Sequence, residues 1–162
     1  MRVSYQQVMA LLRIALGFIL LWAFFDKLFG LGFATTPDKS WLVGASPTYG
    51  FLKFGATGMF GQYFQTLAGN QFVDLLFMSG LLLIGLSLLL GVGIRIATYS
   101  GSLFFLLMWL ALVPSQNNPL LDEHIIYALV LWAVYKSDAD SVFGFGKKWK
   151  QIKFVKDNPI LQ

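Results

Sequence analysis

The chain of 162 residues contains no cysteine and only one histidine, His124. The lack of cysteine excludes disulfides, thiol nucleophiles, zinc–thiolate sites and iron–sulfur clusters within this chain. One histidine cannot supply both ligands of a bis-histidine haem, so we expect no haem and no resident metal. We also find no phosphate loop, dinucleotide fingerprint or HExxH motif, and nothing in the sequence supports nucleic-acid binding. Redox chemistry here would depend on a diffusible quinone or on another subunit.

Charged residues are also scarce, at 12% of the chain against 57% hydrophobic residues. A soluble domain carries about 25% charged residues, so the composition excludes an ordinary soluble domain. Residues 75–94 and 96–121 contain no charged residue at all, and about 20 apolar residues suffice for a helix to cross the hydrocarbon core. The composition predicts an all-α integral membrane protein.

Four membrane-spanning helices account for the apolar stretches and would form one four-helix bundle over residues 1–140. We predict these spans over about residues 7–31, 72–92, 95–114 and 119–136. The first span could instead be a secretory signal peptide, but its apolar region exceeds the usual length of about 7–15 residues and no small-residue cleavage site follows it. We therefore favour an uncleaved span.

The connection over residues 32–71 is too long for an unstructured loop in a compact domain. Its glycines and polar residues make it unsuitable as a fifth span. We expect short interfacial or re-entrant helices that lie over the outer end of the bundle.

Lysine and arginine placement predicts the orientation, because cytoplasmic segments carry an excess of these residues. Four spans put both termini on one side, and that side holds more basic residues than the other, which has Lys27, Lys39 and Lys53. We therefore expect a multi-pass protein of the cell membrane with both termini in the cytoplasm. Residues 141–162 form a basic tail, in which residues 147–156 alternate basic and apolar side chains. This pattern indicates contact with anionic lipid headgroups or simply a topology signal.

Polar side chains gather at the predicted outer helix ends. The sequence-based candidates there are Asp26, Lys27, Asp74, Asn117, Asn118, Asp122, Glu123 and His124. Ionisable residues at membrane spans often mark a functional site. Acids at helix starts also stabilise the helix by accepting free N–H groups, so both interpretations stay open.

His124 is the most informative of these positions. A histidine paired with Asp122 or Glu123 at a membrane face suits proton exchange with a quinone headgroup, whose reduction takes up two protons. We therefore predict His124, Asp122 and Glu123 as the catalytic group. The alternative is a histidine that only hydrogen-bonds the connection over residues 32–71.

Arg13 lies within the first predicted span. Its long stem would allow the guanidinium to reach back to the cytoplasmic headgroups, or the side chain could face the bundle. Helical spacing puts Arg13 on one stripe with Phe24 and Lys27. We favour the inward orientation and predict Arg13, Lys27, Asp26, Asn117 and Asn118 as substrate-binding residues.

Several segments in order resemble DoxX/DoxD-family membrane proteins and together cover about residues 8–136. They are residues 12–17, 26–27, 39–42, 46–52, 80–95 and 117–127. The resemblance implies a four-helix membrane bundle and adds Trp41, in the outer segment, to the substrate-binding candidates. The DoxD branch is the membrane subunit of thiosulfate:quinone oxidoreductase, so the resemblance implies thiosulfate-to-quinone electron transfer with a second oxidoreductase subunit.

A non-catalytic membrane protein that binds lipid or stabilises a partner complex is the alternative function. The lack of redox residues and the many phenylalanines of the outer segment favour it. Small-solute transport is disfavoured, because four short spans leave little room for a pathway unless the chain forms a homo-oligomer. In each case the lipid bilayer is the first partner.

Overall fold

A computed structural model describes residues 3–115 and 118–161. These residues form helices and connecting segments, with no β-strand among them. The long helices are α1 (Tyr5–Phe29), α3 (Gln71–Leu90), α4 (Ile94–Leu112) and α5 (Glu123–Lys136). The shorter elements are η1 (Pro37–Lys39), η2 (Trp41–Val43), η3 (Phe51–Gly55), α2 (Gly61–Thr66), η4 (Ala139–Ser141), α6 (Gly146–Trp149), α7 (Lys153–Asp157) and η5 (Pro159–Leu161).

Three helices are long and apolar enough to cross a membrane. α1, α3 and α4 have 25, 20 and 19 residues and mean hydropathies of 2.3, 2.3 and 1.4. Their bounds agree within two residues with the first three predicted spans. For the described residues the prediction of an all-helical protein is confirmed, and these three helices are candidates for spanning a membrane.

The fourth predicted span, over 119–136, is shorter in the structure. α5 has 14 residues, which corresponds to about 21 Å and falls short of a hydrocarbon core of about 30 Å. α5 begins at Glu123 and not near residue 119. Before it, the Asn118 side chain accepts hydrogen bonds from the backbone N–H groups of Leu120 and Leu121, both at 3.0 Å, and holds these residues in a turn. A four-span bundle is therefore not confirmed by helix length.

Local sequence signals set the ends of the long helices. The side chains of Ser4, Asn70 and Asp122 accept backbone hydrogen bonds at the starts of α1, α3 and α5. Gly30 and Gly91 follow α1 and α3 with φ of 69° and 71°, a left-handed conformation that glycine adopts without steric cost. The polar side chains at these positions therefore lie at the ends of the helices.

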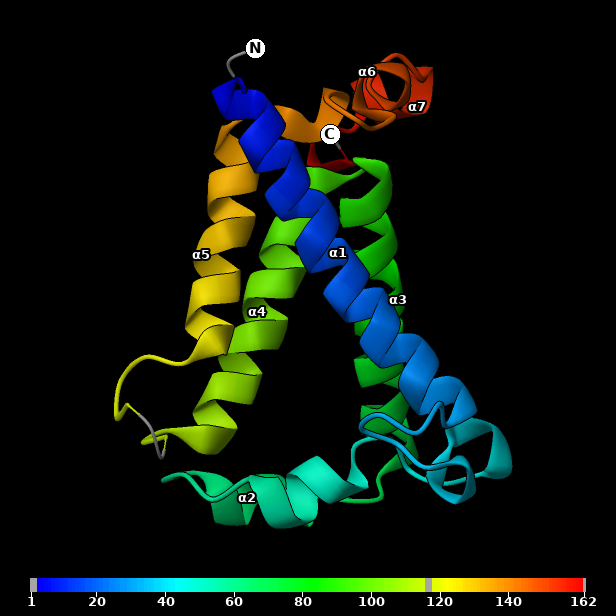
Figure 1. The fold of residues 1–162 in the computed structure, drawn as a ribbon, viewed down its shortest axis with the longest axis vertical. Helices are drawn as coiled ribbons and strands as arrows, with labels where there is room; N and C mark the ends of the chain where they lie inside the picture. The colour runs from blue at the N-terminus through cyan, green and yellow to red at the C-terminus, as the bar shows by residue number, and fades with distance from the viewer. Residues whose placement is uncertain (1–2, 116–117, 162) are drawn as a thin grey trace.

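The long helices pack as two pairs, α1 with α3 and α4 with α5, with further contacts of α3 with α4 and α1 with α5. Figure 1 shows α1 crossing in front of the bundle, with its first turns at the same end as α6 and α7. At Gly17 an added Cβ would lie 2.8 Å from the backbone nitrogen of Leu89 and 3.0 Å from the carbonyl of Gly85. Glycine therefore allows the close crossing of α1 and α3.

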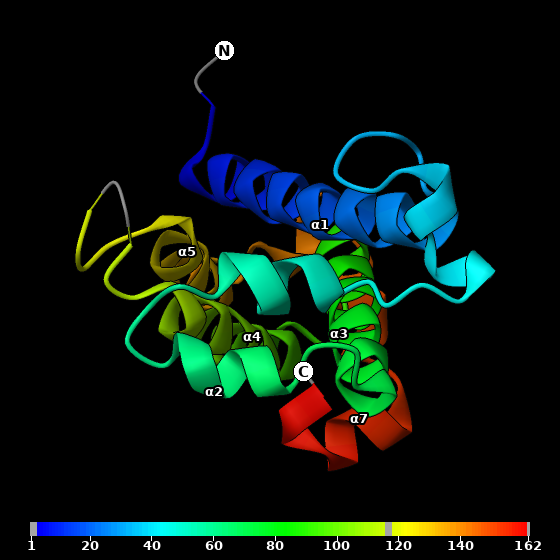
Figure 2. The same cartoon turned by 90° about the horizontal axis from the view of Figure 1, so that it is seen from below.

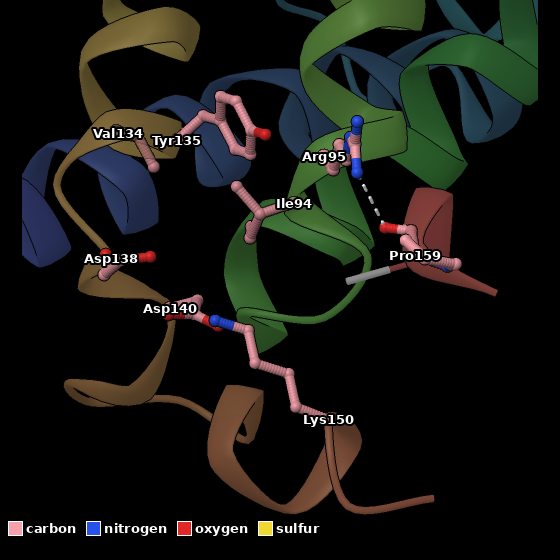
Figure 3. A pocket seen from close by; sticks show the side chains of 8 residues that line it. All are labelled: Ile94, Arg95, Val134, Tyr135, Asp138, Asp140, Lys150 and Pro159. Carbon is pink, nitrogen blue, oxygen red and sulfur yellow. Dashed lines mark hydrogen bonds and ion pairs between the residues drawn. The ribbon is translucent and has the colours of Figure 1, made fainter. Parts of the chain in front are cut away.

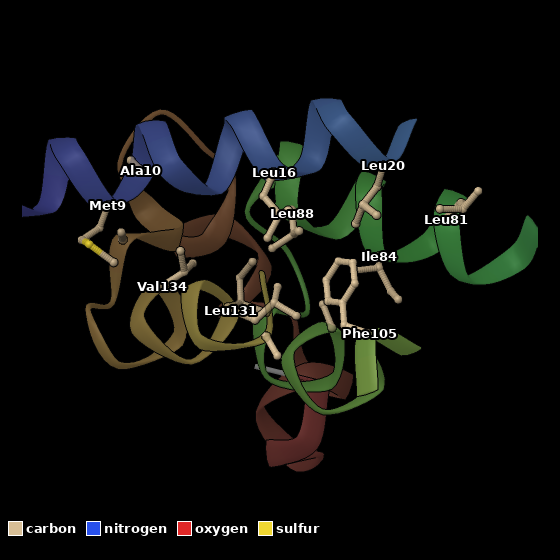
Figure 4. Packing of buried hydrophobic residues seen from close by; sticks show 14 of the residues in the cluster. Met9, Ala10, Leu16, Leu20, Leu81, Ile84, Leu88, Phe105, Leu131 and Val134 are labelled. Atoms are coloured by element: carbon tan, nitrogen blue, oxygen red, sulfur yellow. The ribbon is translucent and has the colours of Figure 1, made fainter. Parts of the chain in front are cut away.

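The core joins all four long helices, as Figure 4 shows. Leu16 and Leu20 of α1 meet Ile84 and Leu88 of α3, and Leu131 of α5 completes the layer. The outer surfaces of the same helices stay apolar. Phe18, Leu83, Leu103 and Leu129 are each 58–63% exposed. Apolar side chains that face outward on apolar helices suit contact with lipid.

The segment between α1 and α3 forms four short helices and lies across one end of the bundle (Figures 1 and 2). Backbone hydrogen bonds from Gly58 to Ala111 and from Met59 to Val113 attach it to the end of α4. At Gly58 any Cβ would collide with the backbone of Val113. We call residues 32–70 the outer segment. The short helices expected there are present.

The C-terminal residues are folded, although the sequence suggested only a basic tail. α6, α7 and η5 pack at the end of the bundle opposite to α2 (Figure 1). The backbone N–H of Phe145 donates to the carbonyl of Leu90, the last residue of α3, at 2.8 Å. The segment therefore touches the turn between α3 and α4 directly.

Candidate functional site

The Asp122 carboxylate and the His124 ring are paired at the start of α5. Asp122 Oδ2 lies 2.9 Å from His124 Nδ1. Asp122 Oδ1 accepts from the backbone N–H groups of His124 and Ile125 at 3.0 and 3.3 Å. Residues i and i+2 do not share a helix face, but Asp122 is the extended N-cap residue, which lets its side chain fold back over the first turn. Of the two neighbouring carboxylates that the sequence offered as partners of His124, the structure places Asp122 against the ring.

The His124 ring is buried, with 8% of the residue exposed. Its centroid lies 6.4 Å from that of Phe105, which in turn lies 5.4 Å from Tyr127. Nδ1 is occupied by Asp122, and among the described residues no group bonds to Nε2. The carboxylate at Nδ1 fixes the orientation of the ring. Nε2 is therefore the ring nitrogen that is left to contact a ligand.

A cavity of about 410 Å³ adjoins this pair at the same end of the bundle. It is lined by Gly55, Thr57, Leu112, Ser115, Leu121, Asp122 and Glu123. Its walls come from the outer segment, the end of α4 and the start of α5. Asp122 thus lines the cavity on one side and contacts the buried imidazole on the other, so that it connects His124 with the cavity.

Asp122, Glu123 and His124 also offer ligand atoms within 4.8 Å of one another. Two carboxylates and an imidazole could hold a divalent metal ion. In the structure, however, the Asp122 carboxylate and Nδ1 of His124 bond to each other. A metal bound through Oδ2 of Asp122 and Nδ1 of His124 would have to replace that contact.

A second cavity, of about 340 Å³, is almost entirely apolar. It lies between α3, α4 and the outer segment and is lined by Thr48, Phe51, Leu52, Tyr63, Phe64, Leu67, Val73, Leu76, Phe77, Phe104, Leu107 and Met108. The rings of Phe77 and Phe104 lie 5.4 Å apart, and those of Phe104 and Phe105 lie 5.6 Å apart. Since Phe105 also contacts His124, aromatic contacts connect this cavity with the histidine.

The predicted site residues at the end of α1, Asp26 and Lys27, lie apart from the pair of Asp122 and His124. Figure 1 shows the last turns of α1 and the first turn of α5 on opposite sides of the bundle end. Asp26 is buried and accepts from the backbone N–H groups of Phe33 and Ala34 at 3.2 and 2.9 Å. Lys27 is half-buried and forms no ion pair with any residue that the structure describes. Asp26 therefore fixes the start of the outer segment, and Lys27 retains a free ammonium group.

Trp41 and Asn118 have structural contacts. Trp41 begins η2 and packs partly buried against the core. Asn118 is exposed and holds the turn before α5. The predicted residue Asn117 lies outside the described residues.

Arg13 faces the bundle, as predicted, and is fully buried. Its guanidinium donates to the backbone carbonyls of Leu88, Leu89, Val142 and Phe143. Because 14 residues separate Arg13 from Lys27 along α1, the two are about 21 Å apart. Arg13 thus anchors the C-terminal segment at the opposite end of the bundle.

Two important acids take roles that sequence reasoning missed. Oδ1 of Asp74 accepts from the Ser46 hydroxyl at 2.8 Å and from the Thr48 hydroxyl and backbone N–H at 2.5 and 3.2 Å. Asp140 pairs with Lys150 at 2.7 Å. The partners of Asp74, Ser46 and Thr48, lie 28 and 26 positions away along the chain, so no local pattern indicated these bonds. No local pattern indicated Asp140.

Comparison with known proteins assigns this chain to no family. No family model, no curated protein and no solved structure matches this chain.

Proposed function

We propose that this chain is the membrane subunit of a quinone-linked oxidoreductase, similar to the DoxX/DoxD proteins, with a proton-exchange site at Asp122 and His124. The observation that carries the proposal is the contact of His124 Nδ1 with Asp122. It leaves Nε2 without a partner among the described residues. Asp122 itself lines one cavity, and Phe105 lies between His124 and Phe104, which lines the other.

The proposal includes four crossings with both termini in the cytoplasm. α5 is short, but it is apolar, it packs along α4, and its outward residues Ile126 and Leu129 are 49% and 59% exposed. Residues 118–122 would add to its reach across the bilayer. The lysine-rich C-terminal segment at the end that holds the first turns of α1 supports the cytoplasmic orientation.

Quinone reduction defines what the pair must do. A quinone that takes up two electrons also takes up two protons and becomes a quinol. Protonated His124 would give a proton from Nε2 to a quinone oxygen and would be reprotonated by way of Asp122, which lines the adjoining cavity. The apolar cavity near Phe104 suits the hydrophobic part of such a molecule.

The electrons must come from a donor, and the family resemblance favours thiosulfate. Two thiosulfate ions give one tetrathionate and two electrons, so that two thiosulfates, one quinone and two protons yield tetrathionate and quinol. This chain has no cysteine and no pair of histidines that could hold a haem. We therefore propose a second subunit that oxidises the sulfur compound. Lys27, with its free ammonium, is the proposed oxyanion contact and lies apart from the proton site.

The experiment is thiosulfate-dependent quinone reduction by the purified complex in quinone-containing bilayers. We expect His124→Gln to lower kcat by about 100-fold, a size typical of losing a general acid, while KM for thiosulfate is kept. Lys27→Gln should raise KM with little change in kcat. Lys39→Gln, which removes an exposed charge of the outer segment, serves as the control.

Two outcomes would contradict the proposal. Unchanged kcat in His124→Gln would remove the proton role from this residue. A stable complex with the partner that reduces no quinone would favour the alternative, a non-catalytic membrane protein.

A further inference from the structure

We propose that the folded C-terminal segment, residues 142–161, is a binding surface for anionic lipid headgroups. This inference is independent of the redox role, because it concerns the opposite end of the bundle and needs only that α1, α3 and α4 lie in a bilayer.

The segment is held firmly against the ends of the long helices. Arg13 donates to the carbonyls of Val142 and Phe143 at 2.9 and 3.2 Å. Lys150 pairs with the buried Asp140, as Figure 3 shows, and Arg95 at the start of α4 donates to the carbonyl of Pro159 at 3.3 Å. The segment therefore keeps a fixed position and does not behave as a free tail.

This attachment fixes its depth in relation to the membrane. α3 ends at Leu90 and α4 begins at Ile94, so the turn between these two apolar helices marks the edge of the hydrocarbon layer. The N–H of Phe145 bonds to Leu90 itself. Residues 142–161 therefore lie at the level of the lipid headgroups.

Large apolar side chains of the segment are exposed instead of buried. The most exposed fractions are those of Phe143 at 61%, Phe145 at 55%, Ile152 at 49%, Phe154 at 67% and Ile160 at 47%. So many exposed apolar side chains in a segment of 20 residues are unfavourable in water. At the headgroup level they can enter the upper part of the acyl chains, as interfacial segments do.

The charges of the segment complement an anionic surface. Lys147, Lys148, Lys153 and Lys156 are exposed and form no ion pair with any described residue, and Asp157 is the one acid between residues 142 and 161. Lysine stems can reach the phosphates while neighbouring apolar side chains enter the bilayer. Of the five lysines in the segment, Lys150 forms an ion pair with Asp140. The ammonium groups of the other four can contact lipid phosphates, and we infer that anionic lipid covers this surface.

The lack of cysteine makes a direct test simple, since one introduced cysteine can be labelled uniquely. Gln151→Cys, at an exposed position of the segment, carries a nitroxide in the full-length protein reconstituted in phosphatidylcholine with or without phosphatidylglycerol. The collision rate of the label with a water-soluble nickel complex reports its exposure to water. We expect phosphatidylglycerol to lower this rate by about twofold or more, and added salt to reverse the change.

Two matched variants decide the cause. Lys147→Gln with Lys148→Gln should remove the phosphatidylglycerol effect. Lys39→Gln with Lys53→Gln, which removes the same charge from the outer segment, should preserve it. Equal collision rates in both lipids for the unmodified segment would overturn the proposal and would indicate a protein partner for this surface. Equal losses in both double variants would also overturn it, since they would indicate a general charge effect. Circular dichroism checks that every variant keeps its helices.

Discussion

The carboxylate of Asp122 bonds to His124 in two ways, through the backbone N–H at 3.0 Å and through ring Nδ1 at 2.9 Å. One residue therefore both starts α5 and orients the histidine. This double role couples helix stability to the proposed proton exchange, and two substitutions can separate the two effects.

Asp122→Asn should keep the helix cap but lose the negative charge beside the ring. Asparagine is as good an N-cap as aspartate, whereas alanine costs about 1 kcal/mol. We expect Asp122→Ala to lower thermal stability in detergent and Asp122→Asn to leave it nearly unchanged, while both reduce quinone reduction strongly. Equal activity of wild type and Asp122→Asn would show that the charge at Nδ1 has no role.

Arg13 should be the most sensitive charged position for stability. Its guanidinium is fully buried and makes bonds to carbonyls of α3 and of the C-terminal segment. A buried carbonyl that is left without its hydrogen-bond donor typically costs about 1–3 kcal/mol. We expect Arg13→Met to lower the unfolding temperature and to speed tryptic cleavage after Lys147 and Lys148.

Arg95→Gln is the control for that experiment, because Arg95 makes one long bond, of 3.3 Å, to the same segment. It should show a clearly smaller effect. If the two variants released the C-terminal segment equally, Arg13 would not be its main anchor.

Much of the fold could be predicted from the sequence, because long uncharged runs have few structural solutions. α1, α3 and α4 follow directly from such runs. The start of α5 was harder to predict, because apolar Leu120 and Leu121 suggest helix while their N–H groups bond to Asn118. Apolar composition indicates membrane contact, but hydrogen bonds of the turn set the helix end.

The site was predictable only where its residues are neighbours in the sequence. The sequence offered Asp122 or Glu123 as the partner of His124, and the local geometry of the helix cap selects Asp122. The position of Lys27 depends on the tilt of α1, which brings its end toward α3 and away from α5 (Figure 1). Helix tilt follows from tertiary packing at positions such as Gly17, and a sequence pattern alone does not determine it.

The glycine at position 17 should be essential for the packing of α1 on α3. A methyl group there would lie 2.8 Å from the Leu89 nitrogen, and overpacking of this kind costs about 1–3 kcal/mol. We expect Gly17→Ala to lower the unfolding temperature. Gly50→Ala is the matched control, since it has open space and helical φ and ψ, and it should be neutral or slightly stabilising. Similar behaviour of both variants would contradict the close crossing.

The attachment of the outer segment should depend on Asp74. Its Oδ1 accepts bonds from Ser46 and Thr48, and bonds to a charged acceptor are stronger than bonds to a neutral one. We expect Asp74→Ala to increase hydrogen exchange of the amides from Thr48 to Ala56 by about tenfold or more. Asp38→Ala, at an exposed acid of the same segment, should not. Unchanged exchange in Asp74→Ala would mean that other contacts hold the segment.

The most direct test of the central claim uses the fact that His124 is the single histidine of the chain. Nitrogen NMR of ¹⁵N-histidine-labelled protein in lipid nanodiscs observes Nδ1 and Nε2 of this ring without overlap. We predict that an added quinone shifts the Nε2 resonance markedly and the Nδ1 resonance little, because Nδ1 already contacts Asp122. Identical spectra with and without quinone would contradict the proposed proton exchange at His124.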